Sequence, residues 1–174
     1  ITNEKGKNLK ERFEVLIKDT KFFDCLVGYF YVSGFHAIYK SLESTEKVRI
    51  LIVISTNPQT YDLMQKATTS EQSALQFSSA ETKEKLGEII EKEIEEAEDS
   101  EKTEGGIYTF IDWIKNGKLE IRAYPSEKIH AKVYIMTFGE GDRDKGRVIT
   151  GSSNFTQAGL MDNLEFNVEL KNRD

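Results

Sequence analysis

Apolar residues recur at two different spacings along the first part of this 174-residue chain. Within residues 9–17 they recur every three to four positions, which predicts an amphipathic helix that ends near Asp19. Residues 24–32 and 48–54 are instead dense in β-branched, aliphatic and aromatic side chains, which predicts strands. The second run has Arg49 as its one polar residue, a pattern typical of a strand buried on both faces.

Capping residues separate these segments and place helices between strands. Ser33-Gly34 offers a cap for a helix over residues 35–42, and Asn57-Pro58 marks the start of another helix. Strands and helices therefore alternate along the chain. This order favours an α/β layer fold over an all-α or all-β fold.

The middle of the chain is polar, then acidic. Residues 70–79 have little pattern, which predicts a connector. The acidic segment that follows carries an apolar stripe and is typical of a surface helix with one buried face. Gly105-Gly106 should end that helix, and Asn116-Gly117 should close a further helix over 107–114. The stripe consists of Leu86, Ile89, Ile90, Ile94 and Ala97.

The C-terminal part is rich in β pattern. Four strands are predicted, over residues 119–124, 129–136, 147–150 and 163–170. The glycine-rich charged loop 139–146 lacks a full set of calcium ligands, so it is interpreted as a hairpin turn.

Composition limits the kind of protein. With 38% hydrophobic and 31% charged residues, the chain has the balance of one globular domain. No run reaches the roughly 18 apolar residues of a membrane helix, so no membrane partner is expected. The single cysteine, Cys25, has no partner for an internal disulfide, which favours a reducing, cytoplasmic location. Because the chain starts at Ile1, we expect it to be a piece of a longer protein.

The net charge of −6 is unevenly distributed. Residues 81–104 hold eleven acids and four lysines, a balance of −7, which leaves +1 for the rest of the chain. Charge therefore neither demands nor excludes a nucleic acid partner. The bases near the candidate site are Lys118, Arg122, Lys128, Lys132, Arg143, Lys145 and Arg147.

One apolar run carries the residues with the most distinctive chemistry. His130 and Lys132 are two positions apart, so both should project from one side of a strand, together with Tyr134. The other side should be buried in an α/β protein. The residues expected there are Ala131, Val133 and Ile135.

Polar residues follow on the next two strands. The strand 147–150 ends in Gly151-Ser152-Ser153-Asn154, a turn whose hydroxyls and amide can bind an anion. In the last strand, Glu165 should face away from an alternating apolar set. That set is Leu164, Phe166, Val168 and Leu170.

These groups fit phosphodiester cleavage without a metal or other cofactor. The imidazole of His130 can attack phosphorus, and the cation and amide can stabilise the charged pentacovalent state. The carboxylate of Glu165 can hold the imidazole in its useful tautomer.

The pattern His130-x-Lys132 followed by Gly151-Ser152-Ser153-Asn154 resembles the HKD signature of the phospholipase D superfamily. Residues 28–35, 49–52 and 129–132 are more narrowly similar to the phospholipase D-like domain at the N-terminus of bacterial Swi/Snf-type helicases. The resemblance implies an α/β fold with a mixed β-sheet flanked by helices on both faces. It also implies that residues 1–174 are a single phospholipase D-like domain, an N-terminal fragment of a helicase-like protein.

The chain departs from the full signature at one position. An aspartate is usual five positions after the lysine, and Thr137 stands there. This looks like the superfamily branch of metal-independent restriction nucleases, in which a glutamate takes that role, and Glu165 is suitably placed. The departure counts against lipid hydrolysis.

The resemblance implies a site shared by two chains, because the family uses two histidines and this chain has one His-x-Lys. His130 would form a phosphohistidine, and its copy across a two-fold homodimer would protonate the leaving oxygen. Lys132 and Asn154 would hold the phosphate, with Ser152 or Ser153 assisting, and Glu165 completes the catalytic set.

Three functions follow in order of preference. The first is a metal-independent nuclease acting on DNA, the second a non-catalytic module for DNA binding or dimerisation, and the third a phospholipase. A lone histidine in an apolar strand is usually structural, but Lys132 two positions on is hard to bury without a partner. His36 has no such neighbour and is interpreted as structural.

Overall fold

The protein's computed structural model describes residues 1–28, 30–54, 101–125, 129–142 and 144–172. The helix expected at Asn57-Pro58, the connector 70–79 and the apolar stripe of the acidic segment lie outside the described residues. No helix within the described ranges is long and apolar enough to cross a membrane.

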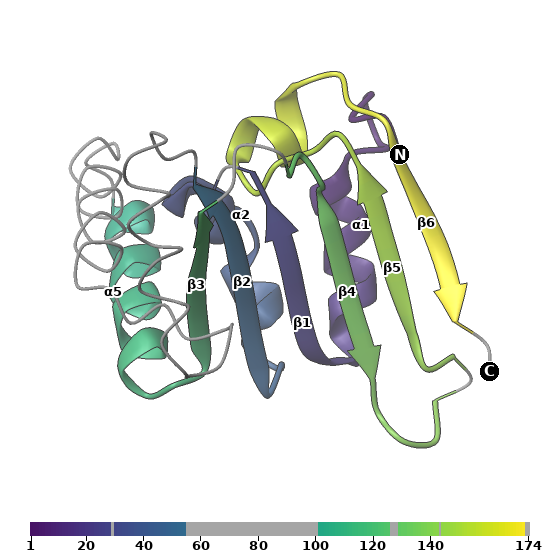
Figure 1. The fold of residues 1–174 in the computed structure, drawn as a ribbon. Coiled ribbons are helices and arrows are strands. Elements are labelled where there is room, and N and C mark those ends of the chain that lie inside the picture. Colours follow the sequence, from purple (N-terminus) through teal and green to yellow (C-terminus); the bar gives the residue numbers. More distant parts are fainter. Residues whose placement is uncertain (29, 55–100, 126–128, 143, 173–174) are drawn as a thin grey trace, which may run out of the picture.

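Six strands form one mixed sheet in the order β3-β2-β1-β4-β5-β6 (Figure 1). The first three in the chain, β1, β2 and β3, run parallel, and β4 to β6 join them in antiparallel pairs. This confirms the predicted α/β fold with a mixed sheet. The strands are β1 Thr20–Val27, β2 Lys47–Ile54, β3 Leu119–Pro125, β4 Val133–Phe138, β5 Gly146–Gly151 and β6 Asn167–Asn172.

The helices described here pack against one face of the sheet, with α1 and α2 behind it in Figure 1. The prediction of helices on both faces also rests on segments within residues 55–100, which lie outside the described residues. The helix expected to end near Asp19 is confirmed, since a short 3-10 turn, Ile17–Asp19, continues α1. The helices are α1 Leu9–Leu16, α2 Val32–Leu42, α5 Glu101–Lys115 and the short π-helical turn Ala158–Asp162.

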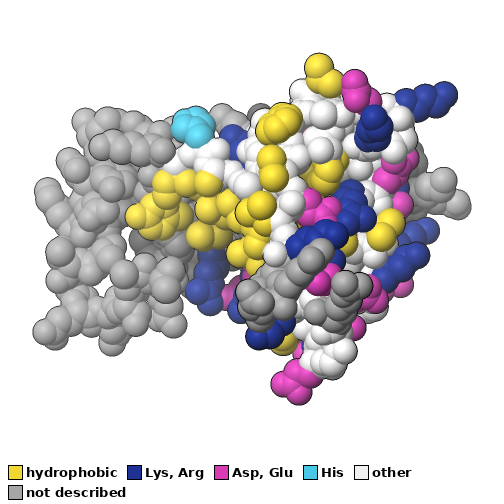
Figure 2. All heavy atoms as spheres, turned by 90° about the vertical axis from the view of Figure 1, so that its right-hand side faces the viewer, with side chains coloured by type: hydrophobic (Ala, Val, Ile, Leu, Met, Phe, Trp, Pro, Cys, Tyr) yellow, Lys and Arg dark blue, Asp and Glu magenta, His cyan; other side chains and the backbone are white. Residues whose placement is uncertain are grey.

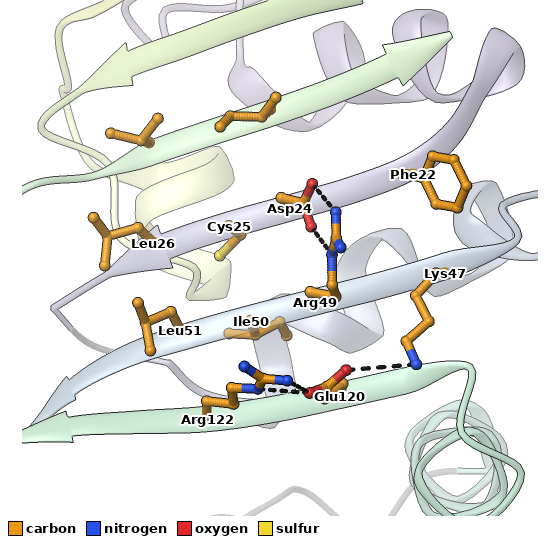
Figure 3. A pocket seen from close by; sticks show the side chains of 12 residues that line it. Phe22, Asp24, Cys25, Leu26, Lys47, Arg49, Ile50, Leu51, Glu120 and Arg122 are labelled. Atoms are coloured by element: carbon orange, nitrogen blue, oxygen red, sulfur yellow. Dashed lines mark hydrogen bonds and ion pairs between the residues drawn. The ribbon is translucent and has the colours of Figure 1, made fainter. Parts of the chain in front are cut away.

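The other face of the sheet, here called the open face, is charged over β1, β2 and β3. The register aligns Asp24, Arg49 and Glu120 in one row across these strands. Arg49 pairs with both carboxylate oxygens of Asp24, and Arg122 pairs with Glu120 (Figure 3). The two guanidinium groups, of Arg49 and Arg122, are therefore neutralised by neighbouring carboxylates.

The open face is apolar over β4, β5 and β6. The register aligns Ile135, Val148 and Leu170 in one row. Beyond the row, Leu164 and Phe166 are 81% and 67% exposed. Figure 2, which views the β6 side, shows hydrophobic side chains gathered on one part of the surface. The alternating apolar set of the last strand therefore faces outward in the described structure.

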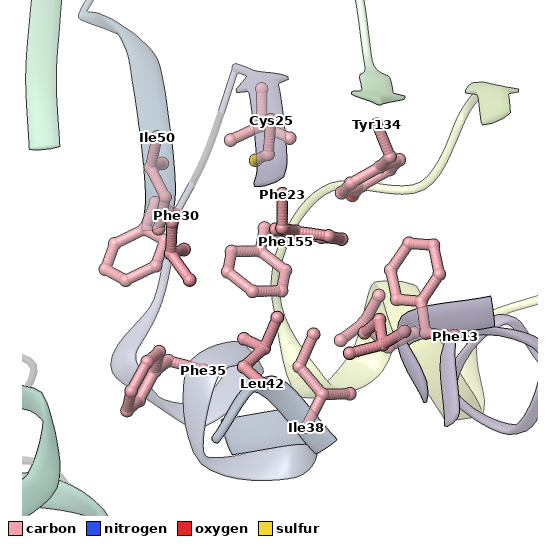
Figure 4. Close-up of a cluster of buried hydrophobic side chains, with 14 of the residues drawn as sticks. Phe13, Phe23, Cys25, Phe30, Phe35, Ile38, Leu42, Ile50, Tyr134 and Phe155 are labelled. Atoms are coloured by element: carbon pink, nitrogen blue, oxygen red, sulfur yellow. The ribbon is translucent and has the colours of Figure 1, made fainter. Parts of the chain in front are cut away.

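The core lies between the sheet and the helices and is built around aromatic rings (Figure 4). The ring centroids of Phe13 and Tyr134 lie 4.9 Å apart, and those of Phe23 and Phe155 lie 6.2 Å apart. Such contacts stabilise a core beyond the apolar area they bury. Burial raises the pKa of the Cys25 thiol, so this cysteine stays protonated and serves as a core residue.

Two predicted boundaries at the start of the chain were wrong. β1 begins at Thr20 rather than Asp24, and Val32 already belongs to α2. Ser33-Gly34 lies inside α2 because Tyr31 is its N-cap residue, and a Cβ at Gly34 would lie 2.4 Å from the Phe155 carbonyl oxygen. The absence of a side chain at Gly34 therefore allows α2 to pack closely against the loop after β5.

Gly105-Gly106 was also misjudged, because both glycines lie inside α5 rather than at its start. A Cβ at Gly106 would lie 2.1 Å from Nδ1 of His36. The glycine thus lets α5 approach α2 closely. His36 also stacks on Tyr39, in line with its structural interpretation.

The buried face of β4 is the opposite of the predicted one. Tyr134 and Met136 are fully buried against the helices, whereas Ile135 is 40% exposed on the open face. Because the strand is apolar on both faces, its pattern alone cannot say which face meets the helices.

An ion-pair network ties α1 to β5 and β6. Arg12 donates to both carboxylate oxygens of Glu169, at 2.6 and 2.8 Å, and Nε of Arg147 lies 3.2 Å from the same carboxylate. Arg147 also pairs with Asp144. The hydrogen bond from Arg12 is the main cause that lowers the pKa of Glu169.

We predict that Glu169→Gln lowers the free energy of unfolding by about 1–3 kcal/mol at pH 7, because two guanidinium groups lose their anion. The pKa of Glu169 is lowered on folding. Its stabilisation is therefore complete above the unfolded pKa of about 4.3 and is lost as pH falls through the folded value. Urea denaturation followed by circular dichroism between pH 3 and 7 checks this.

The control is Glu14→Gln, which removes a partly exposed i,i+4 pair with Lys10 and should cost about 0.5 kcal/mol or less. Equal losses for the two variants, or an unchanged pH dependence in Glu169→Gln, would contradict the role of the network.

Candidate functional site

The ends of four strands lie side by side at one end of the sheet, which is here called the site edge. β1 and β5 end there, and β4 and β6 begin there, because Leu26 pairs with Val133 and Gly151 pairs with Asn167. The edge lies at the carboxyl ends of the parallel strands, where open α/β sheets commonly bind ligands.

His130 and Lys132 lie in the segment just before β4, which starts at Val133 rather than at Ile129 as predicted. The Lys132 carbonyl accepts hydrogen bonds from the Thr150 hydroxyl at 2.9 Å and from the Gly151 N–H at 3.3 Å. These bonds join the His-x-Lys segment directly to the start of the Gly-Ser-Ser-Asn turn.

The His130 side chain is exposed at this edge. The Lys132 ammonium lies 3.0 Å from the carbonyl oxygen of His130, which orders the two residues relative to each other. Among the described residues no hydrogen bond to the imidazole is found, so the ring is accessible for reaction. An exposed imidazole is a suitable nucleophile for a phosphate group.

Glu165 contacts Ser152 rather than His130. The Ser152 hydroxyl donates to the Glu165 carboxylate and accepts from the Phe166 N–H at 3.0 Å. Within the described part of the chain, no hydrogen bond joins Glu165 to His130. The role predicted for Glu165, orienting the imidazole, therefore requires a rearrangement when substrate binds.

Ser153 turns inward. Its side chain is fully buried, its hydroxyl accepts from the Asn167 amide at 2.8 Å, and its carbonyl accepts from the Tyr134 hydroxyl at 2.9 Å. Ser152 and Ser153 were both predicted as phosphate ligands, but a hydroxyl directed into the core has no access to one. Ser152 is the exposed member of the pair.

Asn154 is half-buried at the same edge, next to the residue that follows β1. A Cβ at Gly28 would lie 3.5 Å from Oδ1 of Asn154, so the glycine and the amide are in contact range. The Asn154 carbonyl accepts from the Thr156 N–H at 2.9 Å. The structure thus places four predicted residues, His130, Lys132, Ser152 and Asn154, at one edge.

Sequence reasoning missed two residues that support this edge, Asn167 and the hydroxyl of Tyr134. Asn167 is 3% exposed and Tyr134 is fully buried. Burial is the main cause that raises the pKa of Tyr134, and the negative charge of Glu165 adds to it, so its hydroxyl remains a hydrogen-bond donor. The polar alternation around Glu165 was the available signal for Asn167.

Several bases counted near the site are engaged elsewhere. Arg147 is 9% exposed and bound in the Glu169 network. Lys118 lies 4.0 Å from the centre of the Trp113 ring and donates to the Glu43 carbonyl. Unlike these two bases, Lys132 lies at the site edge itself.

A cavity of about 610 Å³ lies on the open face, over β1, β2, β3 and β4. Its lining includes Phe22, Leu26 and Arg49 (Figure 3). None of the predicted site residues lines it. Within the described ranges, no group of three or more His, Cys, Asp or Glu residues could hold a metal ion.

A family model described as "Cardiolipin synthase, PLD-like domain" matches residues 15–174. The match spans nearly the whole chain. The protein therefore belongs to this family of phospholipase D-like domains, which confirms the resemblance seen in the HKD-type motif.

Solved structures similar to the chain include two mutants of yeast tyrosyl-DNA phosphodiesterase. The SCAN1 mutant is 12% identical with a TM-score of 0.43, and a second mutant is 13% identical with a TM-score of 0.44. Each alignment covers 92% of this chain and 27% of the other. The chain thus spans about a quarter of those proteins. A comparison with curated proteins found no match.

We predict that Gly151→Ala disrupts the site edge. A Cβ at Gly151 would lie 2.1 Å from the Phe166 carbonyl oxygen and 2.5 Å from Oδ1 of Asn167. Separating β5 from β6 to relieve this overlap should cost about 1–3 kcal/mol of unfolding free energy, measured by urea denaturation. Gly28→Ala is the control, since its Cβ would meet only ordinary contact distances. A Gly151→Ala variant as stable as Gly28→Ala would refute the close packing.

Proposed function

We propose that this domain is a metal-independent phosphodiesterase acting on DNA. Its membership in the phospholipase D-like family supports phosphodiesterase-type activity. The observation that carries the proposal is the pair of hydrogen bonds from Thr150 and Gly151 to the Lys132 carbonyl, which holds the two motif segments together. The proposed catalytic residues are His130, Lys132, Asn154 and Glu165.

In the proposed reaction, an imidazole nitrogen of His130 attacks phosphorus. A P–N bond forms, the P–O bond to the leaving nucleoside breaks, and that oxygen takes a proton from an acid. Water then attacks phosphorus and returns a proton to the acid's conjugate base, the P–N bond breaks, and His130 is regenerated. Lys132 and Asn154 hold the phosphate oxygens, and the exposed Ser152 of the turn assists them.

A second copy of the chain would supply the acid. The chain contains one His-x-Lys, so His130 of a second copy, brought across a two-fold axis, would protonate the leaving oxygen. The site edge is suited to this contact because its histidine is exposed. The homodimer is thus part of the proposal.

The choice of DNA as substrate rests on two residues. Thr137 stands where an aspartate is usual in the HKD signature, and Glu165 is suitably placed for the glutamate of the nuclease-like branch. A role as one domain, residues 1–174, of a helicase-like protein belongs to the same proposal. The cytoplasmic location expected from the single cysteine stays a prediction.

We predict that His130→Gln lowers the rate of DNA cleavage in EDTA by at least about 1,000-fold, because the covalent step loses its nucleophile. The folded state should be unaffected, since the side chain is exposed. A gel assay with labelled single- and double-stranded oligonucleotides checks this. The control is Lys145→Ala, an exposed lysine just before β5 begins, at the end of that strand away from the site edge. A dimeric wild-type protein inert on both substrates would contradict the proposal.

A non-catalytic DNA-binding module is the second candidate. It is favoured by the contact of Glu165 with Ser152, which leaves His130 without an orienting carboxylate in the described structure. In that case His130→Gln retains DNA affinity, while Lys132→Ala weakens it and lowers its salt dependence. Loss of turnover in His130→Gln, with turnover present in the wild type, excludes this candidate.

A further inference from the structure

A buried hydrogen-bonded cluster, Tyr134–Ser153–Asn167, lies directly beneath the site edge. The Asn167 amide donates to the Ser153 hydroxyl at 2.8 Å, and the Ser153 N–H approaches Oδ1 of Asn167 at 3.4 Å. The Tyr134 hydroxyl donates to the Ser153 carbonyl at 2.9 Å. All three residues are at most 3% exposed. The backbone and the side chain of Ser153 are therefore both held from the interior.

The position of Ser153 in the chain gives the cluster its significance. Ser152 and Asn154, its two neighbours, are the exposed and half-buried members of the proposed phosphate-binding turn. A residue fixed through its carbonyl, its N–H and its hydroxyl leaves little freedom to the peptide groups on either side. The cluster thus limits where the Ser152 hydroxyl and the Asn154 amide can lie.

The packing around Gly151 makes room for the Asn167 amide. A Cβ at Gly151 would lie 2.5 Å from Oδ1 of Asn167, in addition to its overlap with the Phe166 carbonyl. The glycine of the turn is therefore needed partly for the side chain of Asn167. This independent observation links the turn to the buried amide.

Burying these polar groups is costly unless each is paired, and a buried cluster that is fully paired fixes one arrangement. Apolar side chains could fill the same space, but they would form no hydrogen bonds that fix the orientation of Ser153. We propose that Asn167 and Tyr134 are positioning residues, which act through Ser153 to hold Ser152 and Asn154 in the geometry that binds the phosphate. The inference rests on the proposed function of this edge.

The test compares Ser153→Ala, Asn167→Ala and their double variant with Thr45→Ala. Thr45 is 4% exposed and its hydroxyl donates to the Leu42 carbonyl at 2.7 Å, so this control also loses one buried hydrogen bond. It lies before β2 begins, at the opposite edge of the sheet. Tyr134→Phe removes the remaining contact without changing the ring.

We expect kcat on a labelled oligonucleotide to fall about 10- to 100-fold in Ser153→Ala and in Asn167→Ala, because small displacements of positioned groups have effects of that size. KM should stay within about threefold of the wild-type value, since Lys132 still binds the phosphate. The double variant should be no slower than the slower single variant, because both changes remove one contact. Thr45→Ala should lose similar thermal stability and keep its kcat.

Losses of kcat no larger than in Thr45→Ala, or losses that multiply in the double variant, would overturn the inference. Amide hydrogen exchange of residues 152–155 gives a readout independent of turnover. Faster exchange confined to this turn in Ser153→Ala or Asn167→Ala supports positioning, and exchange that matches Thr45→Ala refutes it. An inactive wild type would overturn the proposed function, and the exchange result would then decide the positioning role alone.

Discussion

The pairing of β4 with β5 is the constraint on which the candidate site depends. Val133 lies opposite Thr150, and the residue before it, Lys132, offers its carbonyl to the Thr150 hydroxyl and the Gly151 N–H. Two segments 18 residues apart in sequence thus meet at one edge. A slip of one residue would turn every side chain of β4 to the other face and move the His130 segment away from the turn.

The candidate site combines an exposed imidazole with a buried support. His130 is exposed, whereas Ser153 and Asn167 beneath the same edge are buried and hydrogen-bonded to each other. A nucleophile must be reached by its substrate, while the groups that stabilise transition-state charge act best when they are held in advance. This separation of tasks between neighbouring residues supports the proposed phosphodiesterase function.

Local patterns predicted the α/β class and the candidate residues, because helix and strand periodicities and the spacing of His130 and Lys132 are local features. The mixed sheet was expected from the family resemblance. The buried face of β4 could not be predicted, since Tyr134 and Ile135 lie in one apolar run and either face could meet the helices. The contact between Ser153 and Asn167 was missed for a different reason. It joins residues 14 positions apart through the β5–β6 register, which no local pattern reveals.

The most direct test of the account is to trap the covalent intermediate. The protein would be mixed with a labelled oligonucleotide in EDTA, quenched at alkaline pH within one turnover, and digested for mass spectrometry. The account predicts a nucleotidyl adduct on His130 and on no other residue. Rapid DNA cleavage with no adduct at any time point, or an adduct on a different side chain, would contradict the claim that His130 is the nucleophile.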